Sequence, residues 1–405
     1  MSEHEVVIVG AGPAGLSAAI ALSRRGVRDI VVLEREAAAG GTPRHTDHLG
    51  FGLRDLHRLM RGPAYARRLR DTAERAGVQI RTATTVLGWS GDTSLRIADE
   101  TGVAGLQARA IVLATGVRER PRSARLVPGD RGAGVMTTGA LQQLTMQGIR
   151  PGHVAVIVGA EHVSFSAVLT LHRAACRVAA MVTSLEHHQT YTPLRLATAT
   201  RHRVPIITGE DIAAIEGRDH VHAVTLTSGR RIECDTVVFT GDWLPNNELA
   251  RSGELMLDAN HHGPVVDGAL RTSRTGVFAA GNVTHPAETA DVCALQGRHL
   301  AVSLLDWLST EHWPARPVAV RAEHPIRWIS PAMLHPQDPA PRDRFVLRVS
   351  EFGQARGIEV SQGDRTLWHG NIVGSLVPNR SLSIAADWVD FIDPEAGEIV
   401  VRLRD

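Results

Sequence analysis

The chain has 405 residues and a formal net charge of +1 at pH 7, and 43% of its residues are hydrophobic. Since a single hydrophobic core stops growing at roughly 250–300 residues, this length predicts two or three domains. The balanced charge gives no reason to expect nucleic acid or an acidic membrane surface as a partner, and every basic residue is an arginine, which excludes lysine Schiff-base chemistry.

Residues 6–34 predict a strand, a glycine-rich turn, a helix and a second strand, in that order. The run at 6–9 is apolar without alternation, which is typical of a buried parallel strand. Gly10, Gly12 and Gly15 match the G-x-G-x-x-G turn, whose glycines let the backbone approach a pyrophosphate at the N-terminus of the following helix.

Glu34 follows the second strand, at the position where a carboxylate can accept both hydroxyls of an adenosine ribose. A glycine-rich turn in an ordinary βαβ unit is the alternative, and the placement of Glu34 argues against it. We therefore expect a dinucleotide site here, with the helix over 14–24 and the second strand over 30–33.

Further elements follow along the first half of the chain. Gly40 and Gly41 open a long loop that is expected to lie over a bound ligand, and a helix starts at Gly62 and ends by Gly77. Strands are predicted over 78–81, 84–89, 95–98, 106–109 and 110–116.

The second half repeats the pattern and then changes. A second βαβ unit is predicted from a strand at 154–158, a helix at 164–175 and a strand at 177–182. The continuing elements are strands over 204–207, 223–226, 236–240 and 276–282 and a helix over 292–308. Prolines then predict a linker over 309–342, and short strands without intervening helices predict a small all-β domain over 343–405.

Three motifs together resemble the two-dinucleotide-domain flavoproteins of the pyridine nucleotide-disulfide oxidoreductase-like superfamily. They are the first glycine turn with Glu34, the Ala114-Thr115-Gly116 turn, and the segment from Thr275 to Asn282. The resemblance implies an α/β fold with two Rossmann-like three-layer domains, the second inserted in the first, and it leaves the C-terminal all-β domain outside. The implied FAD-binding domain covers 1–118 and 242–308, and an NAD(P)-binding-like domain covers 119–241.

The resemblance also implies which residues hold FAD. They are Gly10, Gly12, Pro13, Ala14, Gly15, Glu34, Arg35, Gly41, Thr42, Val86, Ala114, Thr115, Gly116, Gly281 and Asn282. Most members carry Asp where Asn282 stands. An amide there can still hydrogen-bond a ribityl hydroxyl, without adding charge beside a pyrophosphate.

His45 and His48 in the long loop are the candidate catalytic residues. Imidazole suits the proton transfer that accompanies hydride chemistry, because its pKa lies near neutrality. Histidines that only hydrogen-bond the loop backbone are the alternative. His285 is a weaker third candidate.

A closer resemblance points to the FAD/NAD(P) subunits of multi-component bacterial dehydrogenases. It is carried by residues 50–53, 62–66, 128–135, 234–238, 245–249 and 263–267. Relatives include the flavoprotein subunits of glycerol-3-phosphate, opine and hydroxyproline dehydrogenases and of hydrogen cyanide synthase. The resemblance implies a second flavoprotein as partner, and a small iron–sulfur protein as a further one.

The second nucleotide site departs from the family pattern. Glu161 replaces the glycine that lets the backbone contact a pyrophosphate, and Ser164 replaces the third glycine. The next strand ends without an acid for a ribose, so NAD(P) binding is predicted to be weak or lost. A variant that binds the nucleotide in a shifted pose is the alternative. A cluster of arginines precedes this domain and is either a phosphate site or a solvated loop: Arg118, Arg120, Arg122 and Arg125.

The cysteines do not match a disulfide reductase. Cys176, Cys234 and Cys293 are scattered, so neither a redox pair nor a metal site is predicted. No apolar stretch reaches the roughly 18 residues that span a bilayer, and no signal-peptide pattern precedes the first strand, so a cytoplasmic protein without a membrane span is expected.

Three functions remain open from the sequence. The first is an FAD-dependent subunit that exchanges electrons with a partner flavoprotein rather than with NAD(P)H. The second is a stand-alone NAD(P)H-dependent flavoprotein reductase, and the third is a non-catalytic nucleotide-binding assembly subunit. The all-β domain is either a structural cap or a docking face for a partner, of which docking is favoured because catalysis in this family does not need it.

Overall fold

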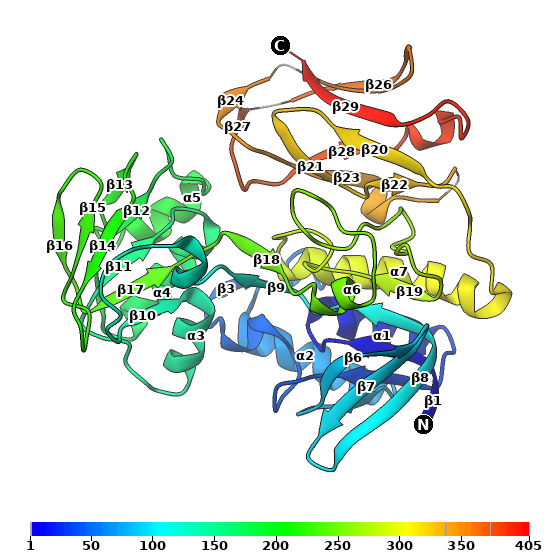
Figure 1. The fold of residues 1–405 in the computed structure, drawn as a ribbon, viewed down its shortest axis with the longest axis horizontal. Helices are drawn as coiled ribbons and strands as arrows, with labels where there is room; N and C mark the ends of the chain where they lie inside the picture. Colours follow the sequence, from blue (N-terminus) through cyan, green and yellow to red (C-terminus); the bar gives the residue numbers. More distant parts are fainter. Residues whose placement is uncertain (1, 337, 356, 373, 405) are drawn as a thin grey trace.

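The first predicted βαβ unit forms the centre of the N-terminal sheet (Figure 1). The structure is a computed structural model and describes residues 2–336, 338–355, 357–372 and 374–404. Strand β1 pairs in parallel with β2 on one side and β8 on the other, which explains its unbroken apolar run. The sheet order is β5-β2-β1-β8-β7-β6, and β19 also pairs with β8.

The strands of this sheet are β1 (Ser2–Val9), β2 (Ile30–Leu33), β5 (Gln79–Arg81), β6 (Thr85–Gly91), β7 (Ser94–Asp99), β8 (Gly102–Leu113) and β19 (Val277–Ala279). Its helices are α1 (Pro13–Arg24), α2 (Gly62–Arg75) and α7 (Ala290–Thr310). A short hairpin, β3 (Leu49–Phe51) with β4 (Met60–Arg61), lies in the long loop, and α6 (Glu248–Ser252) follows the second crossing between domains. The two strands predicted over 106–109 and 110–116 are one strand, β8.

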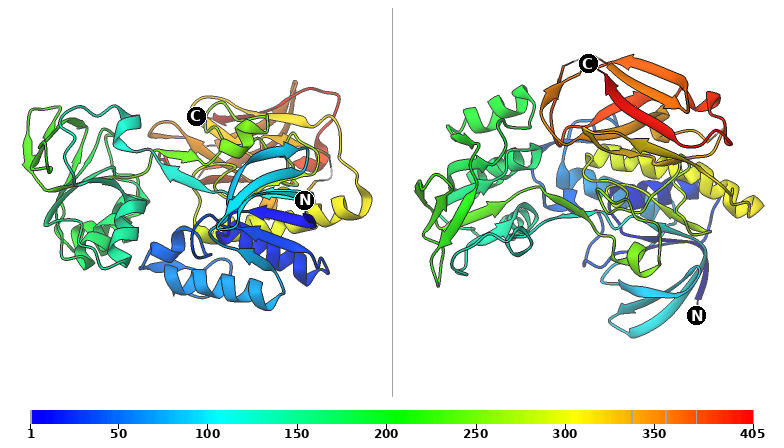
Figure 2. Two further views of the ribbon diagram at one scale, coloured as in Figure 1. Left: turned by 60° about the horizontal axis from the view of Figure 1, so that its bottom comes forward. Right: turned by 45° about the horizontal axis from the view of Figure 1, so that its top comes forward.

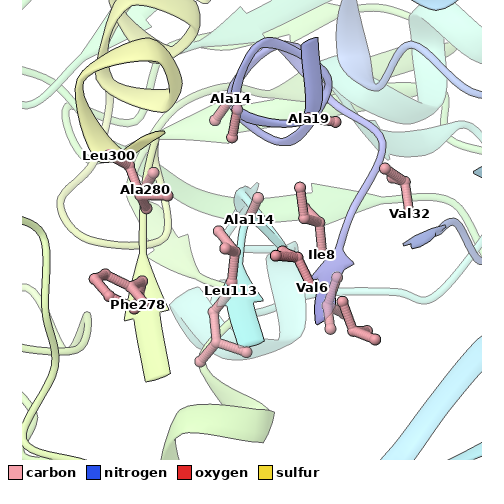
Figure 3. Packing of buried hydrophobic residues seen from close by; sticks show 14 of the residues in the cluster. Val6, Ile8, Ala14, Ala19, Val32, Leu113, Ala114, Phe278, Ala280 and Leu300 are labelled. Atoms are coloured by element: carbon pink, nitrogen blue, oxygen red, sulfur yellow. The ribbon is translucent and has the colours of Figure 1, made fainter. Parts of the chain in front are cut away.

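Helices α1 and α7 pack closely over the sheet. Ala14 and Ala19 of α1 and Leu300 of α7 belong to one buried apolar cluster with the side chains of β1 (Figure 3). Gly297 permits this approach, because a Cβ atom at that position would lie 2.1 Å from the carbonyl oxygen of Ala14.

The second domain contains a parallel five-stranded sheet with the order β10-β17-β11-β12-β13 and a separate antiparallel sheet, β14-β15-β16. The chain enters and leaves this domain through β9 and β18, which pair with each other. The strands are β9 (Val117–Glu119), β10 (Val135–Thr137), β11 (Val154–Val158), β12 (Arg177–Thr183), β13 (Ile206–Thr208), β14 (Ile212–Glu216), β15 (Ala223–Leu226), β16 (Arg231–Glu233), β17 (Thr236–Phe239) and β18 (Trp243–Pro245). The helices are α3 (Thr138–Met146), α4 (His162–Arg173) and α5 (Thr192–Arg195), of which α3 and α5 were not predicted.

The C-terminal region is all-β, as expected, but it starts earlier than the sequence suggests. The proline-bearing stretch predicted as a linker contains β20 and β21, whose side chains Val318, Val320 and Ile329 lie in the core of this region. Its sheets have the orders β22-β20-β29-β25-β26, β21-β23-β28 and β24-β27. The strands are β20 (Val318–Ala322), β21 (Ile326–Ser330), β22 (Met333–Leu334), β23 (Arg344–Val349), β24 (Gly353–Gln354), β25 (Gly357–Gln362), β26 (Arg365–Asn371), β27 (Ser375–Leu376), β28 (Leu382–Ala385) and β29 (Ile399–Arg404).

The three parts contact one another. The C-terminal strands lie over α7 of the first domain, and the second domain lies to one side of both (Figures 1 and 2). Arg380 of the C-terminal region donates to the backbone oxygens of Gln189 and Thr190 in the second domain, and the Asn379 amide donates to the Gln189 side chain at 2.9 Å. The all-β region is therefore packed on both other parts, as a cap would be.

Candidate functional site

A cavity of about 530 Å³ opens at the carboxyl ends of β1, β2 and β8. This is where ligands of open α/β sheets bind. Most of the residues expected at FAD line it. They are Gly10, Gly12, Pro13, Ala14, Glu34, Arg35, Gly41, Thr42, Val86, Ala114, Thr115, Gly116 and Asn282.

The glycine turn leaves room for a phosphate. Gly12 is the N-cap of α1 and has no side-chain cap, and a Cβ atom built on it would meet nothing within 4 Å. The first N–H groups of α1 therefore face the cavity without an internal acceptor at this cap. Gly10 has a φ of +110°, and a Cβ there would lie 2.3 Å from the oxygen of Ala114. The glycine turn and the N-terminus of α1 therefore fit a pyrophosphate.

Gly15 and Gly281, the other two residues expected at FAD, do not line the cavity but allow close packing next to it. A Cβ on Gly15 would lie 2.0 Å from the oxygen of Gly10, and one on Gly281 would lie 2.8 Å from the Cβ of Ala14. Both glycines therefore let α1 approach the strands, and they do not line the cavity themselves.

Glu34 is buried at the edge of the cavity, where its carboxylate accepts the N–H groups of Ala11 at 3.1 Å and Glu36 at 3.0 Å. Burial raises its pKa, while these two backbone donors act in the opposite direction. The carboxylate is held in place by the strand and turn around it, with lone pairs left for ribose hydroxyls. This geometry fits the expected role.

Asn282 lies on the cavity wall, but its amide already has partners. It donates to the Glu288 oxygen at 3.0 Å and accepts from the Glu288 N–H at 2.6 Å. Asn282 thus fixes the loop that leads into α7. An Asp could make only the second of these bonds, which gives a physical reason for the amide at this position.

The structure does not bring His45 or His48 to the cavity wall. His45 Nε2 lies 3.4 Å from the Glu36 carboxylate. His48 Nδ1 lies 2.7 Å from the Leu49 oxygen, and its Nε2 lies 2.8 Å from the Ser166 hydroxyl of α4. Burial lowers the pKa of His48, which favours its neutral form. His48 therefore links the long loop to the second domain.

His285 is fully enclosed. Its Nε2 lies 3.0 Å from the Gln296 amide, its ring packs 5.2 Å from that of Trp328 in the C-terminal region, and burial lowers its pKa to about 3. It too is absent from the cavity lining.

The second nucleotide site differs from the first at the same structural position. Glu161 is the N-cap of α4, and its carboxylate accepts the backbone N–H of Ser164, whose hydroxyl in turn accepts the N–H of Glu161. Thr240 donates to the same carboxylate at 3.2 Å. The helix end that a pyrophosphate would occupy is therefore filled by the Glu161 carboxyl group of the chain itself.

This carboxylate is tightly enclosed. A Cβ on Gly241 would lie 1.8 Å from Glu161 Oε1, so the side chain rests directly on that backbone. Burial raises the pKa of Glu161 to about 7, with Thr240 and Arg125 acting in the opposite direction and Glu119 in the same one.

The arginines of the cluster before the second domain are already engaged by groups of the chain, and Arg118 among them is exposed. The Arg122 guanidinium donates to the oxygens of Val127 at 3.1 Å and Pro128 at 2.6 Å, and Arg125 donates to Thr240 at 2.7 Å. The other two pair with acids, Arg118 with Glu248 and Arg120 with Asp242. Arg118, Arg120 and Arg125 therefore join the two segments that connect the domains, and Arg122 fixes its own loop.

Sequence reasoning missed several residues of the cavity wall. They are Thr46, Phe51, Trp243, Asn246, Glu288 and Cys293. Asn246 donates to the Thr115 oxygen at 2.8 Å, and the Thr115 hydroxyl donates to the Asn246 oxygen at 2.7 Å. The Pro245-Asn246-Asn247 motif could have indicated Asn246, because it stands at the end of β18, the strand that leads the chain back to the first domain.

The three cysteines are free and buried, and of them Cys293 lines the cavity. Burial raises the pKa of Cys176 to about 11 and those of Cys234 and Cys293 to about 12. Such thiols stay protonated at neutral pH and are poor nucleophiles. Within the described residues, no group of three or more His, Cys, Asp or Glu side chains could hold a metal ion.

Comparison with known proteins agrees with this geometry. Residues 4–297 match the family described as pyridine nucleotide-disulphide oxidoreductase. The chain belongs to this family. Its members are FAD-dependent oxidoreductases, and the lining of the first cavity fits that cofactor. In the part of the chain that the structure describes, no helix is long and apolar enough to cross a membrane.

Relatives of two kinds are similar to this member of the family. An opine oxidase subunit from Rhizobium meliloti is 26% identical over 336 residues, which cover 75% of this chain and 62% of that protein. Thioredoxin reductase of Treponema pallidum (strain Nichols) is 27% identical over 322 residues, which cover 76% of this chain and 99% of that one. The solved structure of T. acidophilum thioredoxin reductase has a TM-score of 0.64 at 22% identity, covering 76% of this chain and 99% of that chain, which shows the shared fold.

Proposed function

We propose that the protein is an FAD-dependent subunit that exchanges electrons with a partner flavoprotein rather than with NAD(P)H. The observation that carries the proposal is the contrast between two equivalent helix ends. Gly12 leaves the N-terminus of α1 open to a phosphate, whereas Glu161 fills the N-terminus of α4 with its own carboxylate. A pyrophosphate at the second site would have to displace this carboxylate from its bonds to Ser164 and Thr240.

The residues of the first cavity have separate roles in this proposal. Gly10 and Gly12 admit the pyrophosphate, Glu34 binds the ribose, and Asn282 fixes the loop beside the cofactor through Glu288. When bound, FAD supplies the two-electron chemistry at its isoalloxazine ring. Buried Cys293 and partly buried Phe51 belong to the apolar packing of the first domain and make part of the cavity wall apolar.

Disulfide reduction is not part of the proposal, although thioredoxin reductases are among the similar proteins. A dithiol reductase needs two cysteines that can pair. Cys293 lies at the FAD cavity, whereas Cys176 and Cys234 are buried in the two apolar clusters of the second domain. Thr46 lines the cavity in the loop after Gly41, where its hydroxyl donates to Gln142 at 2.9 Å.

The partner is inferred from the similarity to the opine oxidase protein of Rhizobium meliloti, whose name denotes one subunit of an oxidase. The match spans 62% of that relative's length, so its activity is carried over only as this proposal. A second flavoprotein is the expected partner, and a small iron–sulfur protein is a further candidate.

An anaerobic absorption spectrum tests the proposal. The purified protein should show flavin bands that persist after addition of NADH or NADPH and bleach with dithionite, which shows that the flavin itself is reducible. Bleaching by either nucleotide within seconds would favour the stand-alone reductase. A preparation without flavin bands that fails to bind added FAD would favour the non-catalytic assembly role.

A further inference from the structure

A second cavity, of about 630 Å³, lies between the second domain and the C-terminal region. It shares no lining residue with the FAD cavity, so a role for it is separate from the proposed function. Its wall comes from residues 186–208 on one side and 352–380 on the other, so neither part builds it alone.

The wall carries positive charge that the described residues do not neutralise. Arg195 and Arg380 both line the cavity, and neither forms an ion pair with a described residue. The Arg195 Nε atom is buried and has no hydrogen-bond partner there. Arg380 donates to two backbone carbonyls and lies 4.7 Å from the centre of the Tyr191 ring, which leaves its charge uncompensated.

Two histidines add to the same surface. The Nδ1 atom of His188 is buried without a hydrogen-bond partner among the described residues. Burial lowers the pKa of His188, and the charges of Arg195 and Arg380 lower it further. His187 also lines the cavity, and one acidic side chain, exposed Glu186, lies on the wall as well. The two arginines therefore outnumber the one acid, and the buried Arg195 Nε is left as a donor for an acceptor.

The remaining wall is part apolar and part hydroxyl-bearing. Its apolar side chains are Ala199, Val204, Ile206, Phe352 and Val377, and Thr200, Thr208 and Ser375 contribute hydroxyl groups. Phe352 packs edge-on against His187, with their ring centres 5.4 Å apart. A ligand that fits this wall needs an anionic head for the guanidinium groups and an apolar body for the rest.

We propose that this cavity binds a small organic anion, whose carboxylate or phosphate group is bound by Arg195 and Arg380 and whose apolar part contacts Phe352 and Val377. Such a ligand touches both the second domain and the C-terminal region. Binding therefore stabilises the contact between them by mass action. A dinucleotide is not the expected ligand, because Glu161 closes the phosphate-binding turn of the second domain.

Equilibrium dialysis of the full chain with FAD bound tests this site, with benzoate and phenyl phosphate as probes for the two head groups. At least one probe should bind, and the better one identifies the head group. Arg195→Gln should weaken its binding at least about tenfold, and the fold should persist, because the Arg195 guanidinium makes no hydrogen bond to described residues that would be lost. The matched control is Arg201→Gln, which changes an exposed arginine of the same segment outside the lining and should bind as the wild type does.

Phe352→Ala keeps both arginines and should also weaken the binding of the better probe, since it removes apolar wall. The proposal is overturned if neither probe binds, or if Arg195→Gln binds the better probe as tightly as Arg201→Gln does. It is also overturned if NADPH displaces the probe from the wild type and loses affinity in Arg195→Gln, because the cavity would then belong to a nucleotide.

Discussion

The Glu288 carboxylate and the Arg348 guanidinium lie 2.6 Å apart across the junction between the first domain and the C-terminal region, and both side chains are almost fully buried. Glu288 lines the FAD cavity and is held by Asn282. Arg348 also donates to the Ala287 oxygen at 3.0 Å and lies 5.2 Å from the centre of the Trp328 ring. The C-terminal region therefore braces the loop beside the cofactor.

Arg348→Met should destabilise the protein by about 3–5 kcal/mol, because it leaves the buried Glu288 carboxylate without its partner. It should also lower the amount of FAD retained after gel filtration. Urea unfolding and the ratio of flavin to protein absorbance measure the two effects. Arg344→Met, at an exposed arginine of the same strand, is the control. Equal stability of the two variants would show that the pair does not brace the loop.

The pH dependence of stability should report on Glu161. Since burial raises its folded-state pKa from 4.5 to about 7, the folded protein binds more protons than the unfolded chain between these values. The contribution of protonated Glu161 to stability is fully present below pH about 4.5 and is lost as the pH rises through about 7. This loss lowers the free energy of unfolding by about 3 kcal/mol.

Glu161→Gln should accordingly lose less stability than the wild type between pH 5 and pH 8, both measured by urea unfolding. Burial also raises the pKa of Glu119, which stays in both proteins, so the difference between the two curves reports Glu161 together with its coupling to Glu119. Parallel curves would mean that the carboxylate is not enclosed as described.

Asn282→Asp tests the loop beside the cofactor. The variant keeps the acceptor for the Glu288 N–H but loses the donor to the Glu288 oxygen and places a carboxylate beside that carbonyl. We expect a loss of about 1–3 kcal/mol and weaker FAD retention, measured by thermal unfolding and flavin absorbance. An unchanged melting temperature would show that the amide is not needed to fix Glu288.

Gly12→Ala separates folding from cofactor binding. The backbone at Gly12 is extended and a Cβ there meets no protein atom, so the variant should fold with the wild-type melting temperature of the FAD-free protein. The added methyl group enters the space for the pyrophosphate and should lower FAD affinity at least about tenfold. Gly353→Ala, far from the cavity in the C-terminal region, should bind FAD normally. If Gly12→Ala binds FAD as tightly as the wild type does, the pyrophosphate does not lie at this turn.

The first βαβ unit could be predicted from the sequence because its signals are local. An apolar run, three glycines and Glu34 follow one another within residues 6–34, and each has one structural explanation. Glu161 was recognised for the same reason, since it occupies a fixed position in a second such turn.

The rest depends on contacts between distant residues. Glu288 and Arg348 are 60 residues apart, and no local pattern pairs them. The stretch over 309–342 resembles a linker, yet its prolines lie at the ends of strands or between them, where proline is tolerated. Its strands β20 and β21 pair with strands that start at residue 344 or later. Similarly, nothing near His48 in the sequence indicates that Ser166 would hold it away from the cavity.

The most direct test of the closed second site is the affinity for NADPH of the wild type and of the Glu161→Gly/Ser164→Gly double variant, measured by calorimetry with FAD bound. If the Glu161 carboxylate fills the place of the pyrophosphate, the double variant should bind NADPH at least about tenfold more tightly than the wild type. Tight binding of NADPH by the wild type, with no gain in the double variant, would contradict the account and make the stand-alone reductase the better description.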